Sequence, residues 1–303
     1  MKVALAGATG NLGRPILKAL LDAGLLVTVL SRTTGNSPPP ATHPNLVVKK
    51  VDFDSVPDLK QALEGVEVVV SCLATIAIGS QNPLIDAAEA VGVKRFIPAE
   101  FGMDSLNPLC AQLPVCIPKV STQAYLLEKH KSNPDFTWTS VANGLFLDWG
   151  MEVGFIIDPR SRTATLYNGG DVPFSVTLLA DIAKAVLGII NNQAKTINRV
   201  VYVHSTVTTQ NKLIQYAKEK DGREWTTTTK STAQILEESL AEMDRVAQGT
   251  RDIAAAMLGF SACGMWDLEY GCDFSDRLDN EVLGIRELGE PDLKKLVQSF
   301  VVE

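Results

Sequence analysis

The chain has 303 residues, of which 46% are hydrophobic and 21% are charged, and its formal net charge is −7. This length fits about two domain-sized units, or one doubly wound unit with a smaller lobe. The acidic balance, with Lys and Arg scattered along the chain, excludes nucleic acid and anionic membrane surfaces from the expected partners.

Cysteine and histidine usage argues against disulfide and metal chemistry. The 5 Cys include no C-x-x-C pair and the 3 His lie far apart in the sequence, so we expect neither a disulfide framework nor a metal site. The longest apolar stretch, 68–79, is too short to cross a bilayer. The N-terminal residues lack the pattern of a signal peptide, so we expect a cytoplasmic protein in a reducing compartment.

The first half of the chain alternates strand-like and helix-like segments. Apolar runs predict strands at 2–6, 26–31, 47–51, 67–72, 95–98 and 137–142. Helical spacing of apolar residues predicts helices at 14–23, 55–63, 81–91 and 119–131. Strands that are apolar on both faces and separated by helices indicate a parallel sheet covered on both sides. The expected fold class is therefore α/β, with a doubly wound parallel sheet.

The regular alternation stops near residue 150. Helices are expected at 178–190, 209–220, 235–246, 253–258 and 292–300, with one strand at 200–203. We therefore divide the chain into a sheet domain at 1–150 and a smaller C-terminal α+β lobe at 151–303. A segment near 198–204 is expected to return to the main sheet.

A glycine pattern directly follows the first predicted strand and opens the first predicted helix. Glycine at the first position makes a tight turn, at the second lets a pyrophosphate approach the backbone, and at the third lets the helix pack closely on the strand. The alternative is a turn that serves only the chain path. The predicted dinucleotide contacts from this segment are Gly7, Thr9, Gly10, Asn11, Leu12 and Gly13.

Arg32 ends the second predicted strand, where a protein that prefers NAD usually carries an acidic residue. A guanidinium group there suits a 2′-phosphate, so NADP(H) is the expected cofactor. A solvated arginine at a strand end is the alternative. Asp52 and Phe53 follow the third strand and are expected near the adenine, although Asp52 also suits a helix cap.

Several motifs together resemble one family. They are the glycine pattern, Arg32, Gln81, the segment Phe96-Ile-Pro-Ala-Glu-Phe-Gly102, Lys119 and the segment Asn143-Gly-Leu-Phe-Leu-Asp-Trp149. In this order they resemble the isoflavone reductase-like branch of the NmrA-like, atypical short-chain dehydrogenases, which includes phenylcoumaran benzylic ether and pinoresinol-lariciresinol reductases. The resemblance implies a Rossmann-type domain that binds NADP(H) at 1–150 and a lobe that mainly binds substrate at 151–303.

The resemblance also assigns roles to residues. It makes Lys119 the catalytic lysine and places Pro98, Ala99, Glu100 and Phe101 beside the nicotinamide. Further cofactor contacts are expected from Leu73, Ala74, Lys119 and Asn143. Two departures stand out. The family usually has Ser where this chain has Ala99, and many members carry a second basic residue about nine positions after Arg32. Here Lys49 or Lys50 is the candidate substitute.

The residues themselves offer two candidates for proton transfer. Lys119 stands in the first turn of a predicted helix, where the helix dipole disfavours a cation, so a functional role is indicated; a plain surface lysine is the alternative. Tyr125 and Lys129 match the Tyr-x-x-x-Lys pattern of short-chain dehydrogenases. Six residues of helix separate Lys119 from Tyr125, about 240° around the axis, so both cannot face one nicotinamide. Lys119 is preferred.

The expected substrate contacts are Phe101, Gly144, Phe146, Trp149 and Phe174. Further candidates for a pocket wall are Phe155, Tyr167, Met257, Phe260, Met265 and Trp266. These features predict an NADPH-dependent reductase that delivers hydride to a carbonyl, enone or quinone methide carbon of a small aromatic or polyketide-like metabolite. The alternatives are a redox sensor without catalysis and a redox-neutral isomerase or cyclase that retains NADP. A homodimer is an open alternative to a monomer.

Overall fold

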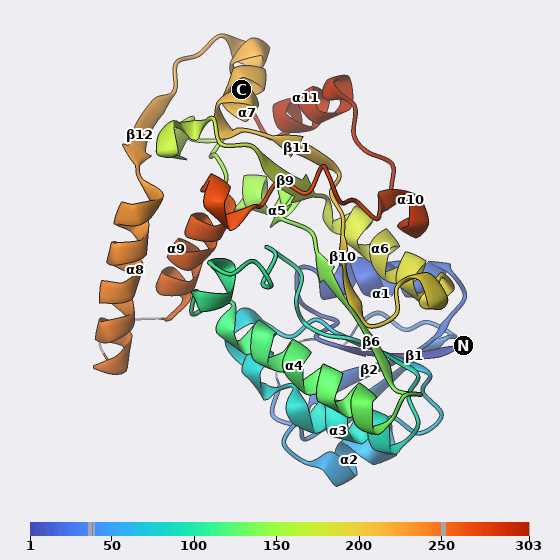
Figure 1. Cartoon of the computed structure of the whole chain (residues 1–303). Helices are drawn as coiled ribbons and strands as arrows, with labels where there is room; N and C mark the ends of the chain where they lie inside the picture. The colour runs from blue at the N-terminus through green and yellow to red at the C-terminus, as the bar shows by residue number, and fades with distance from the viewer. Residues whose placement is uncertain (36–37, 39, 250–252, 303) are drawn as a thin grey trace.

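A parallel sheet of seven strands forms the centre of the computed structural model, which describes residues 1–35, 38, 40–249 and 253–302 (Figure 1). Within these residues the strand order is β10-β6-β5-β4-β1-β2-β3. The strands are β1 (Lys2–Ala6), β2 (Leu26–Arg32), β3 (Leu46–Val51), β4 (Val68–Ser71), β5 (Arg95–Ile97), β6 (Thr137–Ala142) and β10 (Arg199–Tyr202). All of their pairings are parallel.

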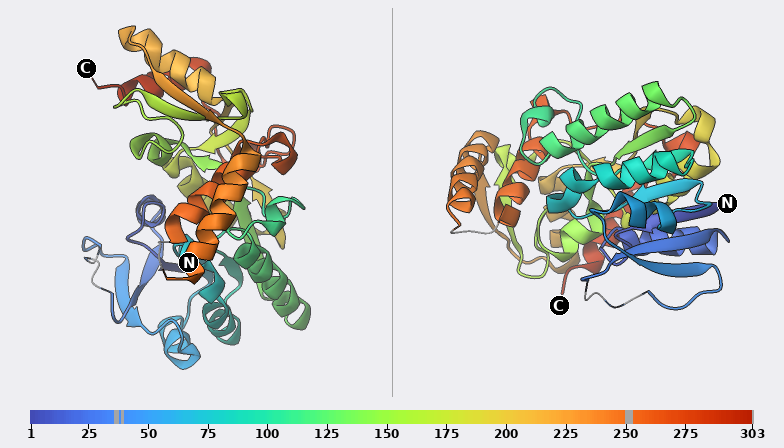
Figure 2. Two further views of the ribbon diagram at one scale, coloured as in Figure 1. Left: turned by 90° about the vertical axis from the view of Figure 1, so that its left-hand side faces the viewer. Right: turned by 90° about the horizontal axis from the view of Figure 1, so that it is seen from below.

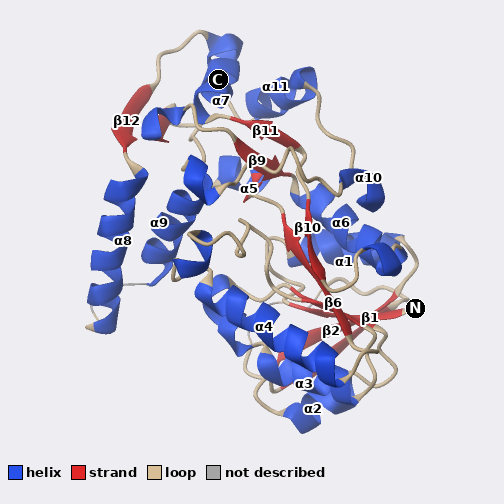
Figure 3. Cartoon of the chain, viewed as in Figure 1, coloured by secondary structure: helices blue, strands red, loops and turns tan. Residues whose placement is uncertain are grey.

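Helices cover both faces of this sheet (Figure 3). Val3 and Leu5 of β1 face one core, which α1 (Gly13–Asp22) and α6 (Leu179–Asn191) cover. Ala4 and Ala6 face the opposite core. The helices over that face are α2 (Val56–Ala62), α3 (Asn82–Ala90) and α4 (Ile117–Ser132). Since the strands are apolar on both faces, burial on both sides is what their sequence requires. The predicted doubly wound α/β fold is confirmed.

The sheet has a topological switch point. From β1 the chain proceeds through β2 and β3 toward one edge, and then through β4, β5 and β6 toward the other. Open α/β sheets bind ligands at the carboxyl ends of strands beside such a point. The loops after β1, β4 and β5 therefore meet at one place.

The rest of the chain forms a smaller lobe with two short sheets, ordered β11-β9-β7 and β12-β8. Its strands are β7 (Leu145–Phe146), β8 (Thr163–Tyr167), β9 (Phe174–Thr177), β11 (Thr206–Thr208) and β12 (Thr226–Lys230). Its helices are α5 (Leu147–Glu152), α7 (Gln210–Asp221), α8 (Thr232–Ala247), α9 (Ile253–Met265), α10 (Asn280–Leu283) and α11 (Glu290–Ser299). Five 3₁₀ turns are described: η1 (Thr75–Ser80), η2 (Cys110–Gln112), η3 (Asn168–Gly170), η4 (Gln193–Lys195) and η5 (Leu268–Tyr270).

The lobe contains strands that the sequence analysis did not predict. The strands β7 and β11 have two and three residues, and β12 is a threonine-rich, mostly exposed strand with no apolar alternation. The helix α8 begins at Thr232, three residues before the predicted start, because Ser231 caps it with Oγ accepting from the N–H of Gln234. The helices α8 and α9 lie side by side at the margin of the lobe (Figure 2).

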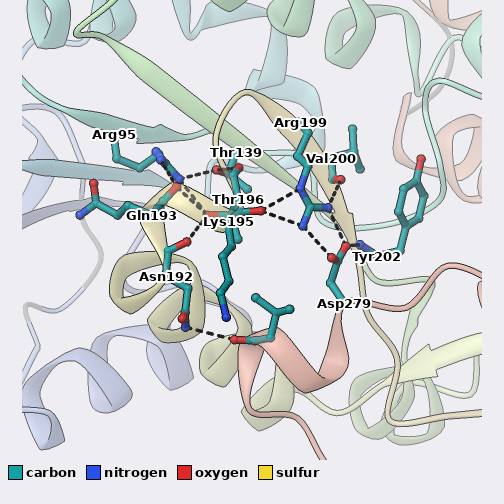
Figure 4. Close-up of polar contacts among 11 residues, drawn as sticks. Arg95, Thr139, Asn192, Gln193, Lys195, Thr196, Arg199, Val200, Tyr202 and Asp279 are labelled. Carbon is teal, nitrogen blue, oxygen red and sulfur yellow. Dashed lines mark hydrogen bonds and ion pairs between the residues drawn. The ribbon is translucent and has the colours of Figure 1, made fainter.

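Arg95 links β5 to β6 and to η4 through a buried polar network (Figure 4). Its side chain is 1% exposed. The guanidinium group donates to the hydroxyls of Thr137, Thr139 and Thr196 at 2.7–3.0 Å and to the carbonyl of Gln193 at 2.8 Å. Burial lowers the pKa of Arg95 to about 10, so the group stays charged at neutral pH. The network ties the amino ends of the strands together, away from their carboxyl edge.

A second contact in Figure 4 attaches the C-terminal segment to the sheet. Arg199 of β10 binds the carboxylate of Asp279 through two nitrogens, at 2.7 and 2.9 Å. The Asp279 carboxylate also accepts from the N–H of Tyr202. No helix within the described residues is both long enough and apolar enough to cross a membrane.

Candidate active site

The glycine turn after β1 has the geometry that a phosphate-binding loop needs. Gly7 has φ +80°, and a Cβ there would overlap the carbonyl oxygen of Cys72 after β4. A Cβ at Gly13 would overlap the carbonyl oxygen of Gly7. Gly10 differs, because a Cβ there meets one described atom within 4 Å, the oxygen of Gly7 at 3.4 Å, and the residue is exposed. Two glycines thus serve packing, and the middle one leaves open space.

The start of α1 is suited to an anion. The Ncap residue, Leu12, supplies no side-chain cap, and the first turn carries no acidic residue. The first N–H groups of a helix have no partner inside the helix and carry a partial positive charge. Thr9, Gly10 and Asn11 are wholly or partly exposed at the same turn. These residues fit the pyrophosphate of a dinucleotide.

The structure distinguishes the two lysines that the sequence left as alternatives. Lys50 lies opposite Ser31 in the pairing of β2 with β3, and its Nζ is 3.4 Å from the carbonyl oxygens of both Arg32 and Gly35. Lys49 points to the other face and donates to the carbonyls of Gln61 and Ala62 at the end of α2. Lys50 therefore lies at the Arg32 turn, and Lys49 does not.

The neighbouring predicted contacts also lie at this edge. The carboxylate of Asp52 accepts from the N–H of Asp54, and Ser55 caps α2, so Asp52 forms a turn before the helix. Phe53 is half-buried against the core below. Leu73 and Ala74 follow β4 beside the glycine turn, and Ala74 is exposed.

The segment after β5 is held from several directions. The buried Gln81 accepts from the N–H of Ala99 at 2.9 Å. The carbonyl of Gly102 accepts from the N–H groups of Asn143 and Gly144, each at 2.9 Å. Phe101 has φ +25°, an unusual conformation for a residue with a side chain. Such strain persists where the surroundings impose it and is concentrated at functional sites.

Lys119 reaches this segment from the first turn of α4. It is 5% exposed, and its Nζ donates to the carbonyl of Glu100 at 2.5 Å. A Cβ on Gly102 would lie 3.2 Å from the same nitrogen. The cation is therefore fixed over the backbone of residues 100–102, at the carboxyl end of β5.

The side chain of Glu100 turns toward α4. Its carboxylate accepts from Gln123 at 3.1 Å, and Gln123 also donates to Ser105 at 2.9 Å. Burial raises the pKa of Glu100, while the positive charge of Lys119 and the hydrogen bonds from Ser105 and Gln123 oppose the rise. The backbone carbonyl and the side chain of Glu100 are thus both bonded to residues of α4.

Tyr125 and Lys129 lie elsewhere. The hydroxyl of Tyr125 donates to Asp86 of α3 at 2.5 Å, and Lys129 pairs with Asp86 and Glu89 at 2.7 and 2.9 Å. Both side chains therefore serve the contact between α3 and α4. This geometry supports the preference for Lys119 over the Tyr-x-x-x-Lys pattern.

The predicted substrate residues fall into two groups. Phe146 and Trp149 are partly exposed, with ring centroids 6.3 Å apart. Phe174 is fully buried and packs edge-on against Trp266, so it belongs to the core of the lobe. Gly144 is buried as well, with φ +62°, and a Cβ there would overlap the carbonyl of Ser175 in β9.

A row of aromatic rings continues from this pair into a groove. Trp149 contacts Phe155 at 6.4 Å between centroids, and Phe155 contacts Trp266 at 5.5 Å. Trp266 stacks on Tyr167 at 4.7 Å. Phe155 and Tyr167 line a groove of about 460 Å³ between α8 and α9. The further wall residues are Ile235, Glu238, Ser239, Glu242, Ala255, Ala256, Leu258 and Gly259.

The sequence analysis missed Ser105 and Gln123. Gln123 stands four residues after Lys119, so both lie on one face of α4. That spacing was the available signal. Ser105 had none, because its approach to Glu100 depends on the path of the loop after β5.

Comparisons with known proteins identify relatives. The model of the NmrA-like family matches residues 1–262. The chain is 34% identical over 247 residues to oxidoreductase poxI of Penicillium oxalicum, covering 79% of this chain and 76% of the relative. It is 27% identical over 236 residues to the isoflavone reductase homolog IRL of Zea mays, covering 73% of this chain and 75% of that relative. The predicted class, an oxidoreductase, is confirmed by such relatives.

Among solved structures, the complex of leucoanthocyanidin reductase from Vitis vinifera with NADPH has a TM-score of 0.75 at 20% identity, covering 100% of both chains. The predicted cofactor type is the one that this neighbour holds. The described fold and the family match agree with the resemblance inferred from the sequence motifs. The chain belongs to the NmrA-like family.

Proposed function

We propose that this protein is an NADPH-dependent reductase that delivers hydride to an electron-poor carbon of a small aromatic or polyketide-like metabolite. The carbon is that of a carbonyl, an enone or a quinone methide. The observation that carries the proposal is the buried ammonium group of Lys119, held over residues 100–102 at the carboxyl edge of the sheet. A cation there can bind and protonate an oxygen of the substrate.

The chain's residues divide the binding task. The turn from Gly7 to Gly13 and the start of α1 receive the pyrophosphate, and Arg32 with Lys50 receives the 2′-phosphate. Pro98 to Phe101 and Asn143 form the floor beside the nicotinamide. The amide oxygen of Asn143 is buried and has no hydrogen-bond partner within the described residues, so it fits a ligand donor. When bound, NADPH supplies the hydride.

The aromatic row supports the proposed substrate class. Phe146 and Trp149 lie directly after β6, and Phe155 and Tyr167 carry the apolar surface into the groove between α8 and α9. Flat rings stack on or meet such surfaces edge-on. A substrate of this class would place its reacting carbon near Lys119 and its distal ring along the row.

The test is NADPH oxidation with a panel of aromatic ketones, enones and quinone methides, for wild type and Lys119→Met. Loss of turnover in the variant, with NADPH still bound, supports the proposal. Equal turnover in both removes the role of Lys119. Product formation without net NADPH oxidation would instead identify a redox-neutral isomerase or cyclase. Nucleotide binding without any turnover would identify a sensor.

A further inference from the structure

A buried carboxyl group lies next to the proposed catalytic lysine. Glu100 is 4% exposed, and its backbone carbonyl is the acceptor for Lys119. The second carboxyl oxygen, Oε1, is buried and has no partner within the described residues. A hydrogen-bonded amide would pack here at less cost, because an ionised group that is buried and incompletely bonded is strongly destabilising.

The groups around this carboxyl are few and identifiable. Lys119 and Gln123 approach from α4, and Ser105 and Asp104 approach from the loop after β5. Lys119, Ser105 and Gln123 favour ionisation of Glu100, and the charge of Asp104 opposes it. The carboxylate of Asp104 is itself paired with Arg277 at 3.0 Å. The thiol of Cys116, the Ncap residue of α4, is a further titratable neighbour.

We propose that Glu100 is a positioning residue for the reduction: as a neutral acid it leaves the Lys119 ammonium group free to face the reacting oxygen, and as a carboxylate it draws that group into an ion pair. This inference rests on the proposed role of Lys119. The ammonium group of Lys119 acts electrostatically on this buried carboxyl, so the charge state of Glu100 changes the field that the ammonium group feels. Ionisation of Glu100 then ends activity on the alkaline side of the pH profile.

The direction of the net effect follows from burial. Burial outweighs the neighbouring cation and the two hydrogen bonds, so the pKa of Glu100 lies above its ordinary value. Removing the hydroxyl of Ser105 deletes one interaction that favours the carboxylate. The pKa of Glu100 therefore rises further in Ser105→Ala, and activity persists to a higher pH.

The first experiment is the pH profile of kcat/KM for wild type, Glu100→Gln and Ser105→Ala, with Ser121→Ala as control. Ser121 is on the exposed side of α4 and bonds to the carbonyl of Ile117. We expect the alkaline limb of the Glu100→Gln profile, scaled to its own maximum, to move up by at least about one pH unit. Ser105→Ala moves the limb in the same direction by a smaller amount, and Ser121→Ala leaves it unchanged.

Two results overturn the inference. One is a folded Glu100→Gln protein whose alkaline limb coincides with that of wild type. The other is a folded Glu100→Gln protein that is inactive at every pH. If Glu100→Gln does not fold, Ser105→Ala decides, because an unchanged or lowered alkaline limb contradicts the proposal.

A second experiment needs neither cofactor nor turnover. Infrared spectra of protein labelled with ¹³C-glutamate are recorded against pH, and the Glu100 band is assigned by its loss in Glu100→Gln. We expect a protonated carboxyl band at pH 7, and in Lys119→Met its titration moves to higher pH because the nearby cation is gone. Absence of the band at pH 7 in wild type overturns the inference. Wild-type turnover by Lys119→Met overturns the proposed function instead, whatever the spectra show.

Discussion

The ammonium nitrogen of Lys119 lies 2.5 Å from the carbonyl oxygen of Glu100. This bond joins the first turn of α4 to the segment that follows β5, so the lysine is positioned by backbone and not by a flexible partner. The Nζ group retains donors for a second acceptor. An oxygen of a bound substrate is the acceptor that the proposed function requires.

The middle glycine of the phosphate loop provides a test that separates binding from folding. In Gly10→Ala we expect an unchanged melting temperature without ligand, since a Cβ there finds open space, and an NADPH affinity reduced at least about tenfold by loss of close phosphate approach. Calorimetric titration measures the affinity. Gly13→Ala is the matched comparison, and it is expected to lower the melting temperature because its Cβ overlaps the oxygen of Gly7. Equal NADPH affinity in Gly10→Ala and wild type would argue against this loop as the cofactor site.

The two adjacent lysines of β3 provide a test of cofactor choice. Lys50→Gln is expected to raise the KM for NADPH about tenfold and to leave that for NADH nearly unchanged, because one charged contact to the 2′-phosphate is lost. Lys49→Gln is the control, since its side chain caps α2. Steady-state kinetics with both cofactors give the ratio of the KM for NADPH to the KM for NADH. If the two variants behave alike, Lys50 does not contact the phosphate.

The Tyr-x-x-x-Lys pattern assigns proton transfer to Tyr125, whereas the contacts in the structure favour Lys119. Substitution of each residue tests the two assignments. Tyr125→Phe is expected to keep kcat within about twofold of wild type, while Lys119→Met loses about 100-fold or more, the range for a general acid. The tyrosine variant should lose up to about 1 kcal/mol of unfolding free energy, as its bond to Asp86 is removed. Stopped-flow kinetics and urea unfolding measure the two effects. A large fall in kcat for Tyr125→Phe would reverse the assignment.

The groove between α8 and α9 is tested by filling it. Ala255 is an exposed residue of its wall, so Ala255→Trp should raise the KM of extended aromatic substrates at least about fivefold and leave NADPH binding intact. Leu240→Trp is the control, because Leu240 is exposed on α8 and is not among the residues that line the groove. Competition between substrate and a fluorescent aromatic probe would report the same site. An unchanged KM in Ala255→Trp would exclude the groove as part of the substrate surface.

The Arg95 network predicts a large effect on stability without an effect on chemistry. Arg95→Met leaves the hydroxyls of Thr137 and Thr139 buried with fewer partners, so we expect a loss of about 3 kcal/mol in unfolding free energy. The side chain of Arg199 is 39% exposed in its pair with Asp279, so Arg199→Met should cost about 1 kcal/mol. Urea unfolding at constant pH compares the two variants. Equal losses would mean that the hydroxyls are satisfied in another way after substitution.

Much of the fold and part of the candidate site were predictable from sequence, because they depend on local rules. The period of apolar residues indicates which segments are strands and which are helices. The glycine turn is recognisable because Gly7 requires a positive φ and Gly13 a close approach, and both requirements exclude other residues locally. The short strands β7 and β11 escaped prediction because two or three residues carry no usable period.

Tertiary structure determined which side chains point toward the site, because this depends on the register of strand pairing and on which face of an element is buried. Lys49 and Lys50 are equivalent in sequence, but successive side chains of a strand point to opposite faces, and pairing with β2 puts Lys50 beside Arg32. Phe174 was expected to contact substrate, but β9 packs it against Trp266 in the core of the lobe, where it is fully buried. The carboxyl group of Glu100 acquired its environment because α4 and the loop after β5 exclude water around it. Each of these outcomes follows from contacts between segments far apart in the chain, which local sequence patterns do not encode.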